Sequence, residues 1–233
     1  MAGNGKNSAS ESVHSTVRQL IAGNEFPCLG AKASLNQGTL VNVEISDLRH
    51  PSSVRELAER LTLFLEENSG EPLSRFSVLA ATDSVTSIAN EIEFEEYTWG
   101  VLRALHSIDT APWDPRYSPD PDSTDFKFSF GGRAFYVVGL HPRASRLARR
   151  VACPTLVFNP VWQFDLLREV GHLDRMIQLI RTRDKRLQGQ MNPNLNFEGI
   201  LSDAVQYSGR AVGSDWKCPF TRGDKDGATG LHS

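Results

Sequence analysis

The residues whose types and spacing could carry chemistry begin at GLHPRASRLARR, residues 139–150, directly after the apolar run AFYVV. His141 precedes Pro142, and a proline ring biases the preceding residue toward an extended backbone, which would hold the imidazole on a rigid segment. A neutral imidazole held in this way suits the axial position of a heme iron. A surface-loop histidine that only forms local hydrogen bonds is the more ordinary interpretation, since one histidine is a weak signal. In either role we expect it to contribute little to the core.

Four arginines follow that histidine: Arg143, Arg146, Arg149 and Arg150. They fall on more than one face of the turn or helix expected there. Some of them could pair with heme propionates, because the guanidinium fork matches a carboxylate in shape and charge. A solvated basic surface is the competing and commoner interpretation.

Three other residues are rival ligands for a heme iron. Cys28 in FPCLGAKA and Cys218 in WKCPF could supply a thiolate, the other common strong protein ligand of heme. Inert burial is the commoner role of a free cysteine. His106 lies near the end of a predicted helix, where the helix dipole favours an imidazolium that has no ligand role.

A carboxylate and an aromatic ring share one face of the predicted helix that contains EFEEYTW. Trp99 follows Glu95 by four residues, so the two side chains are neighbours on a helix. Together they could hold a flat cation such as a guanidinium through charge-assisted hydrogen bonds and stacking. We therefore predict that Glu95 anchors a substrate nitrogen, with Glu96 as the less favoured neighbour, while Trp99 packs against heme or substrate. Solvated surface glutamates are the ordinary alternative.

Composition and motif content narrow the class of protein. The 233 residues carry a net charge of −3, with 39% hydrophobic and 23% charged residues, which argues against a nucleic-acid or membrane-surface protein. No apolar run is long enough to span a bilayer. The three cysteines show no CxxC spacing, which argues against structural zinc or a disulfide framework and favours the cytoplasm. Neither a G-x-G-x-x-G motif after a strand nor a P-loop is present.

Apolar periodicity and turn residues predict a single α+β domain at residues 13–220, between a disordered tail at 1–12 and a flexible tail at 221–233. Hairpin signals outnumber clean βαβ units, so we expect a mixed, mainly antiparallel sheet with flanking helices. The expected elements are a helix capped by Ser52, a strand at 76–81, a helix at 93–106, a long loop at 113–125, a hairpin at 126–140 around Gly131–Gly132, a strand at 155–159, and helices starting near Val161 and His172.

Five stretches together resemble the YqcI/YcgG family, and specifically its heme-dependent N-oxygenase branch. They are FPCLGAKASL (26–35), FSFGGRAFYVVGLHPRASRLARR (128–150), TLVFNPVWQFDLLR (155–168), IRTRDKRLQGQMNPNL (180–195) and SDAVQYSGRAVGSDWKCPF (202–220). These stretches cover most of the chain, and the GLHPxASRxARR and QYSGR…WxCPF strings are specific. Val161 and Trp162 stand where the family is expected to have a more polar pair, which leaves the substrate open.

The resemblance implies an enzyme that uses heme b, dioxygen and electrons from a ferredoxin or reductase to oxidise an sp² C–NH₂ nitrogen. The implied substrates are the guanidine of arginine, cyclic guanidines or 2-aminoimidazole, and the products are N-hydroxy or nitro compounds of natural-product biosynthesis. The match of the HP motif to this branch makes His141 the expected axial ligand. A heme peroxygenase that uses hydrogen peroxide, a heme sensor or carrier, and a heme-free interaction protein are the alternatives. Whether the chain forms a homodimer stays open.

Overall fold

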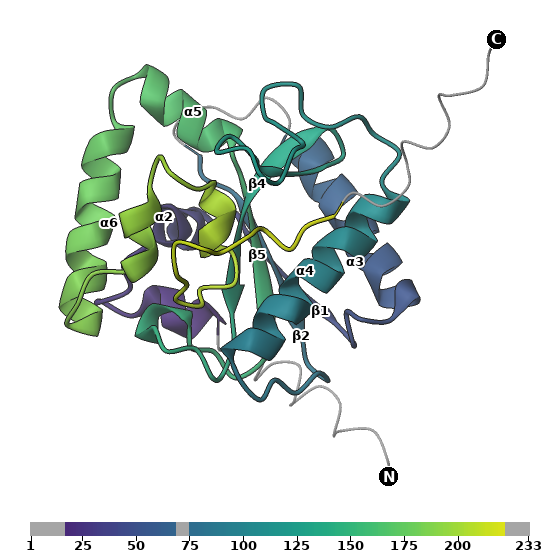
Figure 1. Ribbon diagram of the computed structural model, residues 1–233, viewed down its shortest axis with the longest axis horizontal. Helices are drawn as coiled ribbons and strands as arrows, with labels where there is room; N and C mark the ends of the chain where they lie inside the picture. The colour runs from purple at the N-terminus through teal and green to yellow at the C-terminus, as the bar shows by residue number, and fades with distance from the viewer. Residues whose placement is uncertain (1–16, 69–74, 222–233) are drawn as a thin grey trace.

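A five-stranded sheet divides the molecule, with the strands in the order β1-β2-β5-β4-β3 (Figure 1). The computed structural model describes residues 17–68 and 75–221. The strands are β1 (Leu40–Ile45), β2 (Val78–Asp83), β3 (Phe128–Phe130), β4 (Arg133–Leu140) and β5 (Thr155–Pro160). The helices are α2 (Leu29–Gln37), α3 (Pro51–Glu67), α4 (Glu91–Ile108), α5 (Trp162–Glu169) and α6 (Leu173–Gln188), with 3-10 turns η1 (Leu147–Arg149), η2 (Pro193–Phe197) and η3 (Asp203–Gln206).

The sheet is mixed and mainly antiparallel, which confirms the predicted fold class. Only β1 and β2 pair in parallel, with Leu40 opposite Val78 and Ile45 opposite Asp83. The pairs β2–β5, β5–β4 and β4–β3 are antiparallel. β1, β2 and β4 therefore run in the same direction, and their carboxyl termini lie at the same end of the sheet.

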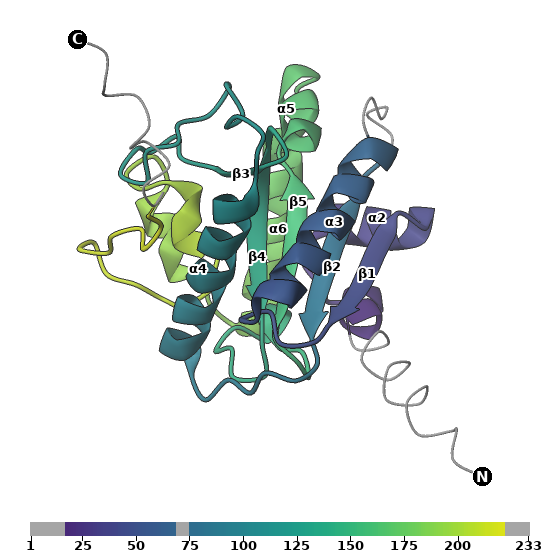
Figure 2. The same ribbon diagram turned by 90° about the vertical axis from the view of Figure 1, so that its right-hand side faces the viewer.

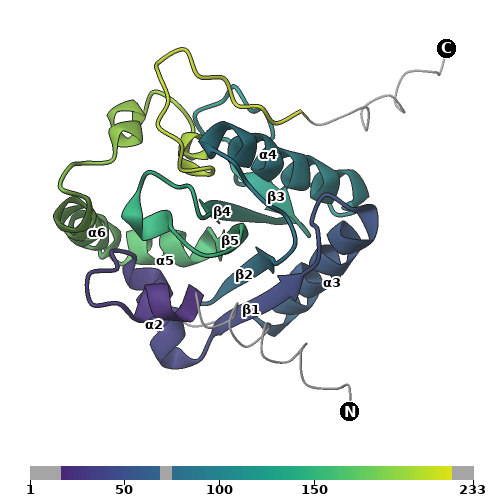
Figure 3. The same ribbon diagram turned by 90° about the horizontal axis from the view of Figure 1, so that it is seen from below.

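Helices cover both faces of the sheet (Figures 1 and 3). α3 and α4 cover one face, where Leu57 and Leu102 pack in one buried cluster with Phe135 and Phe158 of the sheet. α2, α5 and α6 lie on the other face, which has a smaller cluster that includes Ala31, Leu40, Val78 and Leu140. β2 and β5 are buried along their whole length because both of their faces are covered.

Two helix starts show how local sequence fixes the ends of these elements. α3 begins at Pro51, and the Nδ1 atom of His50 accepts the N–H of Ser52 at 3.3 Å. The prediction that Ser52 caps this helix was wrong, because proline is favoured at the first helical position and the residue before it takes the cap. α4 has a capping box, in which Asn90 accepts the N–H of Glu93 and the Glu93 carboxylate accepts the N–H of Ala89.

The chain after α6 passes beside the part of β4 that β3 does not cover, from the α6 side of the sheet to the α4 side (Figures 2 and 3). Outside η2 and η3 it has almost no regular structure, and hydrogen bonds hold it in place. The N–H of Gly139 donates to the carbonyl of Tyr207 at 2.7 Å. The Nδ2 atom of Asn194 donates to the carbonyls of Val205 and Arg210. This crossing brings residues 202–220 against α4.

Of the remaining predictions about chain organisation, those for the loop and the hairpin are confirmed, and those for the two tails fall on residues that the structure does not describe. Residues 113–125 contain no helix and no extended strand, as the loop prediction required. The hairpin around Gly131–Gly132 is formed by β3 and β4. The predicted tails lie outside the described residues, apart from Thr221. Across residues 17–68 and 75–221, no helix has both the length and the apolar character needed to cross a membrane.

Candidate functional site

His141 follows the last residue of β4 and lies inside the molecule. Its exposed fraction is 1%, so the expectation of a surface-loop residue was wrong. The imidazole stacks on Phe94 of α4, with ring centroids 4.1 Å apart and an interplanar angle of 20°. Its Nδ1 atom is buried and has no hydrogen-bond partner among the described residues. Leaving such an atom without a partner costs free energy, so it is the kind of atom that a ligand would satisfy.

The buried position also decides the charge of this histidine. Burial lowers the pKa of His141 from 6.5 to about 4, although the nearby Glu91 carboxylate opposes the shift. Arg149 adds a smaller effect in the same direction as burial. The imidazole is therefore neutral at neutral pH, and only a neutral imidazole nitrogen has the lone pair that binds a metal.

Three of the four arginines after His141 differ in their surroundings. Arg143 is exposed and makes no ion pair within the described part of the chain. Arg146 is buried and donates to the carboxylate of Asp184 on α6. Arg150 donates to the backbone carbonyl of Ala144 at 2.6 Å. The solvated-surface interpretation therefore does not describe Arg146, which joins this loop to α6.

Arg149 has a different environment from the other three. It is half-buried, and its Nη1 atom donates to the carbonyls of Gly139 and Tyr207, each at 3.2 Å. Burial lowers the pKa of its guanidinium below the ordinary value of 12.5. A glycine is required at position 209, because a Cβ atom there would lie 2.5 Å from the Cδ atom of Arg149.

Glu95 is the centre of a buried polar cluster beneath the C-terminal segment. Arg210 donates from Nε at 2.8 Å and from Nη2 at 2.5 Å to the Oε2 atom of Glu95. The Oε1 atom accepts from Ser208 Oγ at 3.3 Å and from Trp216 Nε1 at 3.2 Å. Both carboxylate oxygens are thus occupied by the chain itself, while Glu96 is exposed.

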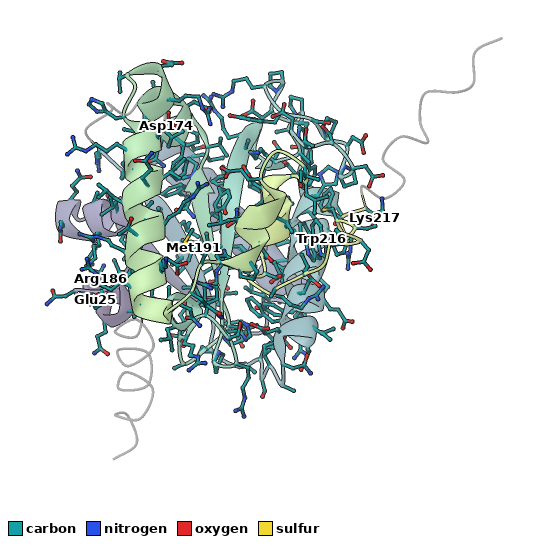
Figure 4. All side chains as sticks on the ribbon, turned by 60° about the vertical axis from the view of Figure 1, so that its left-hand side comes forward. Glu25, Asp174, Arg186, Met191, Trp216 and Lys217 are labelled. Atoms are coloured by element: carbon teal, nitrogen blue, oxygen red, sulfur yellow. The ribbon has the colours of Figure 1, made fainter. Side chains whose placement is uncertain are left out.

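Trp99, also on α4, is fully buried. It stacks on Tyr207 with ring centroids 5.6 Å apart and meets Trp216 at 6.5 Å. In Figure 4, Trp216 lies on the opposite side of the view from α6, which carries the labelled Asp174 and Arg186. The sequence predicted the pairing of Glu95 with Trp99 on one helix face. It gave no indication that Arg210 pairs with Glu95, because the two residues are 115 positions apart in the chain.

The three rival ligands lie in different settings. Cys28 caps α2, and burial raises the pKa of its thiol. Burial raises the pKa of Cys218 to about 12, so this thiol is protonated at neutral pH. His106 is 9% exposed and packs edge-on against Trp113 and Phe220.

The α4 side of β4 brings the two main sets of predicted residues together. Phe94 and Glu95 are adjacent on α4, and Phe94 contacts His141 while Glu95 holds Arg210. Tyr207 joins the two sets, because it stacks on Trp99 and accepts the N–H of Gly139. α4 thus contacts a neutral buried imidazole through Phe94 and, through the next residue, supplies an internal carboxylate that already binds a guanidinium.

Residues 17–221 match the sequence model of the YqcI/YcgG family. The chain belongs to the YqcI/YcgG family. It is 25% identical to the family protein YqcI of Bacillus subtilis (strain 168) over 207 residues, which are 87% of this chain and 78% of YqcI. It is 24% identical to YcgG of the same organism over 205 residues, 86% of this chain and 77% of YcgG.

A third relative of this YqcI/YcgG chain has a name that states an activity. The "Putative N(omega)-hydroxy-L-arginine synthase DcsA" of Streptomyces lavendulae is 25% identical over 151 residues, which are 60% of this chain and 55% of DcsA. No solved structure matches the chain at a significant level.

Proposed function

We propose that this protein is a heme-dependent N-oxygenase that hydroxylates a guanidine of arginine type, with dioxygen and external electrons. The similarity to a protein named for the synthesis of N-hydroxy-arginine carries the proposal. The matched region includes neither all of this chain nor all of that relative, so the structure of the site must supply the further argument.

The residues at the end of β4 fit a heme group in their donor chemistry. His141 supplies a neutral imidazole whose Nδ1 atom is buried and has no partner among the described residues. Heme b, when bound, supplies the dioxygen chemistry that no amino-acid side chain can carry out. His141 is the proposed ligand, and Cys28, Cys218 and His106 remain the rivals to be tested.

The α4 side of the site fits a guanidinium substrate. Glu95 already binds one guanidinium, that of Arg210, through two hydrogen bonds to a single oxygen. A substrate guanidinium can reach this carboxylate only by displacing Arg210. In such a complex Glu95 would hold the charge of the substrate and orient its nitrogens, while Trp99 and Trp216 would exclude water.

The experiment that tests the proposal is a turnover assay on protein reconstituted with hemin. L-Arginine, a cyclic guanidine and 2-aminoimidazole are incubated with reductant under air, and the products are analysed by mass spectrometry. We expect one added oxygen atom on L-arginine, dependent on both dioxygen and reductant.

The same assay separates the alternatives. Oxidation driven by hydrogen peroxide without reductant would identify a peroxygenase. A Soret band without any product would identify a sensor or carrier. The absence of a Soret band would overturn the heme proposal.

A further inference from the structure

Arg149 is a half-buried cation that has no ion-pair partner among the described residues. Within the described part of the chain, its side chain makes two hydrogen bonds, from Nη1 to the carbonyls of Gly139 and Tyr207. The neighbouring Arg146 provides the contrast, because it is paired with Asp184. Arg210 is likewise paired, with Glu95.

The acidic side chains whose charges reach Arg149 or Tyr136 are paired with other cations. Asp184, whose charge reaches Arg149, is bound by Arg146. Asp203 and Glu198, whose charges reach Tyr136, are bound by Lys127 at 2.7 Å and by Arg181 at 2.6 Å. Arg149 is therefore a half-buried cation without a carboxylate partner among the described residues, whereas the unpaired Arg143 and Arg150 of the same loop are exposed. A buried charge without a partner is costly, and an anionic ligand would remove that cost.

Tyr136 adds a second polar group without a partner at the same place. Its ring meets the ring of Tyr207 at 5.7 Å, and the carbonyl of Tyr207 accepts a hydrogen bond from Arg149. Tyr136 and Arg149 lie within range of each other's charge, and Cys28 lies within range of both. The hydroxyl of Tyr136 makes no hydrogen bond to any described residue, although the side chain is half-buried. A phenol and a guanidinium are both hydrogen-bond donors, which is the donor set that a carboxylate requires.

The surroundings of this pair are apolar on the side of α6. Tyr136 and Val138 alternate with the buried Phe135 and Val137 along β4, so both leave the strand on its α6 face. Val138 packs in the cluster on that face, while the ring of Tyr136 also reaches Tyr207 and the α4-side cluster. α6 is amphipathic in sequence, yet only Leu173 of its apolar residues is fully buried. The other apolar residues of its inner face are half-buried, and they are Met176, Ile177, Ile180 and Leu187. These half-buried apolar residues of α6, together with Val138, suit a ligand that has an apolar or planar body and a carboxylate.

We propose that Arg149 and Tyr136 form a carboxylate-binding site on the α6 side of β4. In this site the Tyr136 hydroxyl and the unused guanidinium donors of Arg149 bind the carboxylate, while Val138 and the inner face of α6 contact the body of the ligand. The inference deepens the proposed function, in which a carboxylate comes either from a heme propionate or from the α-carboxylate of an arginine-like substrate.

Two matched pairs of probes test the site and distinguish the two sources. Hemin is compared with hemin dimethyl ester, and L-arginine is compared with agmatine, which lacks the α-carboxylate. Binding to the full chain is measured by absorbance titration for the hemins and by calorimetry for the amines. The variants are Arg149→Gln and Tyr136→Phe, and the controls are Arg143→Gln and Arg150→Gln in the same loop. Tyr136→Phe removes a hydroxyl that bonds to no described residue, so it keeps the test valid if Arg149→Gln fails to fold.

The expected result is a loss of roughly tenfold or more for the carboxylate form of one pair, because a hydrogen bond to a charged group is removed. The ester or agmatine should bind the variants as it binds the wild type, and the controls should match the wild type. A loss confined to hemin identifies a propionate site, and a loss confined to L-arginine identifies a substrate site.

The inference and the proposed function fail in different ways. Equal affinities of wild type and variants for both carboxylate probes would overturn the site, even if hemin binds and turnover occurs. A loss of the same size for both members of a pair would also overturn it. Discrimination between L-arginine and agmatine that disappears in the variants would support the site even in a protein that never binds hemin.

Discussion

Glu95 and Arg210 lie 115 residues apart in the sequence and form an ion pair in which Nη2 of Arg210 is 2.5 Å from Oε2 of Glu95. The pair joins α4 to the C-terminal segment, residues 202–220, that passes beside β4. Ser208 and Trp216 donate to the other oxygen of the same carboxylate, so Glu95 organises the whole segment from 208 to 216. This cluster holds the segment in place and lies where we predict that a substrate guanidinium binds.

Glu95→Gln should lower the free energy of unfolding. The side chains of Glu95 and Arg210 are 9% and 27% exposed, so the substitution leaves a guanidinium largely buried without its counter-charge. Removing one partner of a buried pair costs about 3–5 kcal/mol, and the lower end applies here because Arg210 retains some water. Urea unfolding followed by tryptophan fluorescence measures the change. Glu96→Gln, on the exposed neighbour, should unfold like the wild type, and similar values for the two variants would contradict the assignment.

His141→Ala should abolish the Soret band of the reconstituted protein, because the proposed ligand is removed. Added imidazole should restore part of the band by occupying the space that the side chain leaves next to Phe94. His172→Ala, which removes an exposed histidine, serves as the control. If the band survives in His141→Ala but disappears in Cys28→Ala, Cys218→Ala or His106→Ala, one of those three rivals is the ligand.

Stability should fall as the pH decreases from about 6.5 toward 4, and His141 should be one identifiable cause. Burial holds its folded-state pKa at about 4, below the ordinary value of 6.5. Above pH 6.5 the imidazole is neutral in both the folded and the unfolded chain, so its titration does not change the free energy of unfolding. Between the two values the unfolded chain binds a proton that the folded chain does not, which costs up to about 3 kcal/mol. Urea midpoints measured across this range should fall less steeply in His141→Gln than in the wild type, whereas parallel curves would show that the histidine titrates normally.

Gly139→Ala should destabilise the protein and disturb the contact between Phe94 and His141. A Cβ atom at residue 139 would lie 2.5 Å from Cε1 of Phe94 and 3.0 Å from the carbonyl oxygen of Tyr207. Overpacking of this kind costs about 1–3 kcal/mol. Gly100→Ala is the matched control, because a Cβ atom at that helical glycine has open space. That change should stabilise α4 by up to about 1 kcal/mol, since alanine is the better helix former. Thermal unfolding of the two variants should therefore shift in opposite directions.

The sequence determined those parts of the fold that depend on neighbours along the chain. The hairpin follows from two apolar runs joined by Gly131–Gly132, and both glycines adopt the positive φ that such a turn requires. α4 was predicted from helical spacing of its apolar residues, although its ends extend by two residues on each side of the predicted range. β1 and α2 were not predicted. β1 places Asn42 and Glu44 among its apolar residues at an edge of the sheet, and α2 has a weakly amphipathic sequence.

The tertiary structure alone decided which charges are matched and which are not. Four arginines in one loop look equivalent in sequence, yet Arg146 meets Asp184 on α6, Arg143 meets solvent, and Arg149 is half-buried with no carboxylate partner in residues 17–68 or 75–221. The same holds for Glu95, whose partner comes from a segment that reaches it only by passing beside β4. Pairing of charges and burial depend on the distance between atoms in space, and residues far apart in the chain become neighbours only when the sheet and its helices have formed.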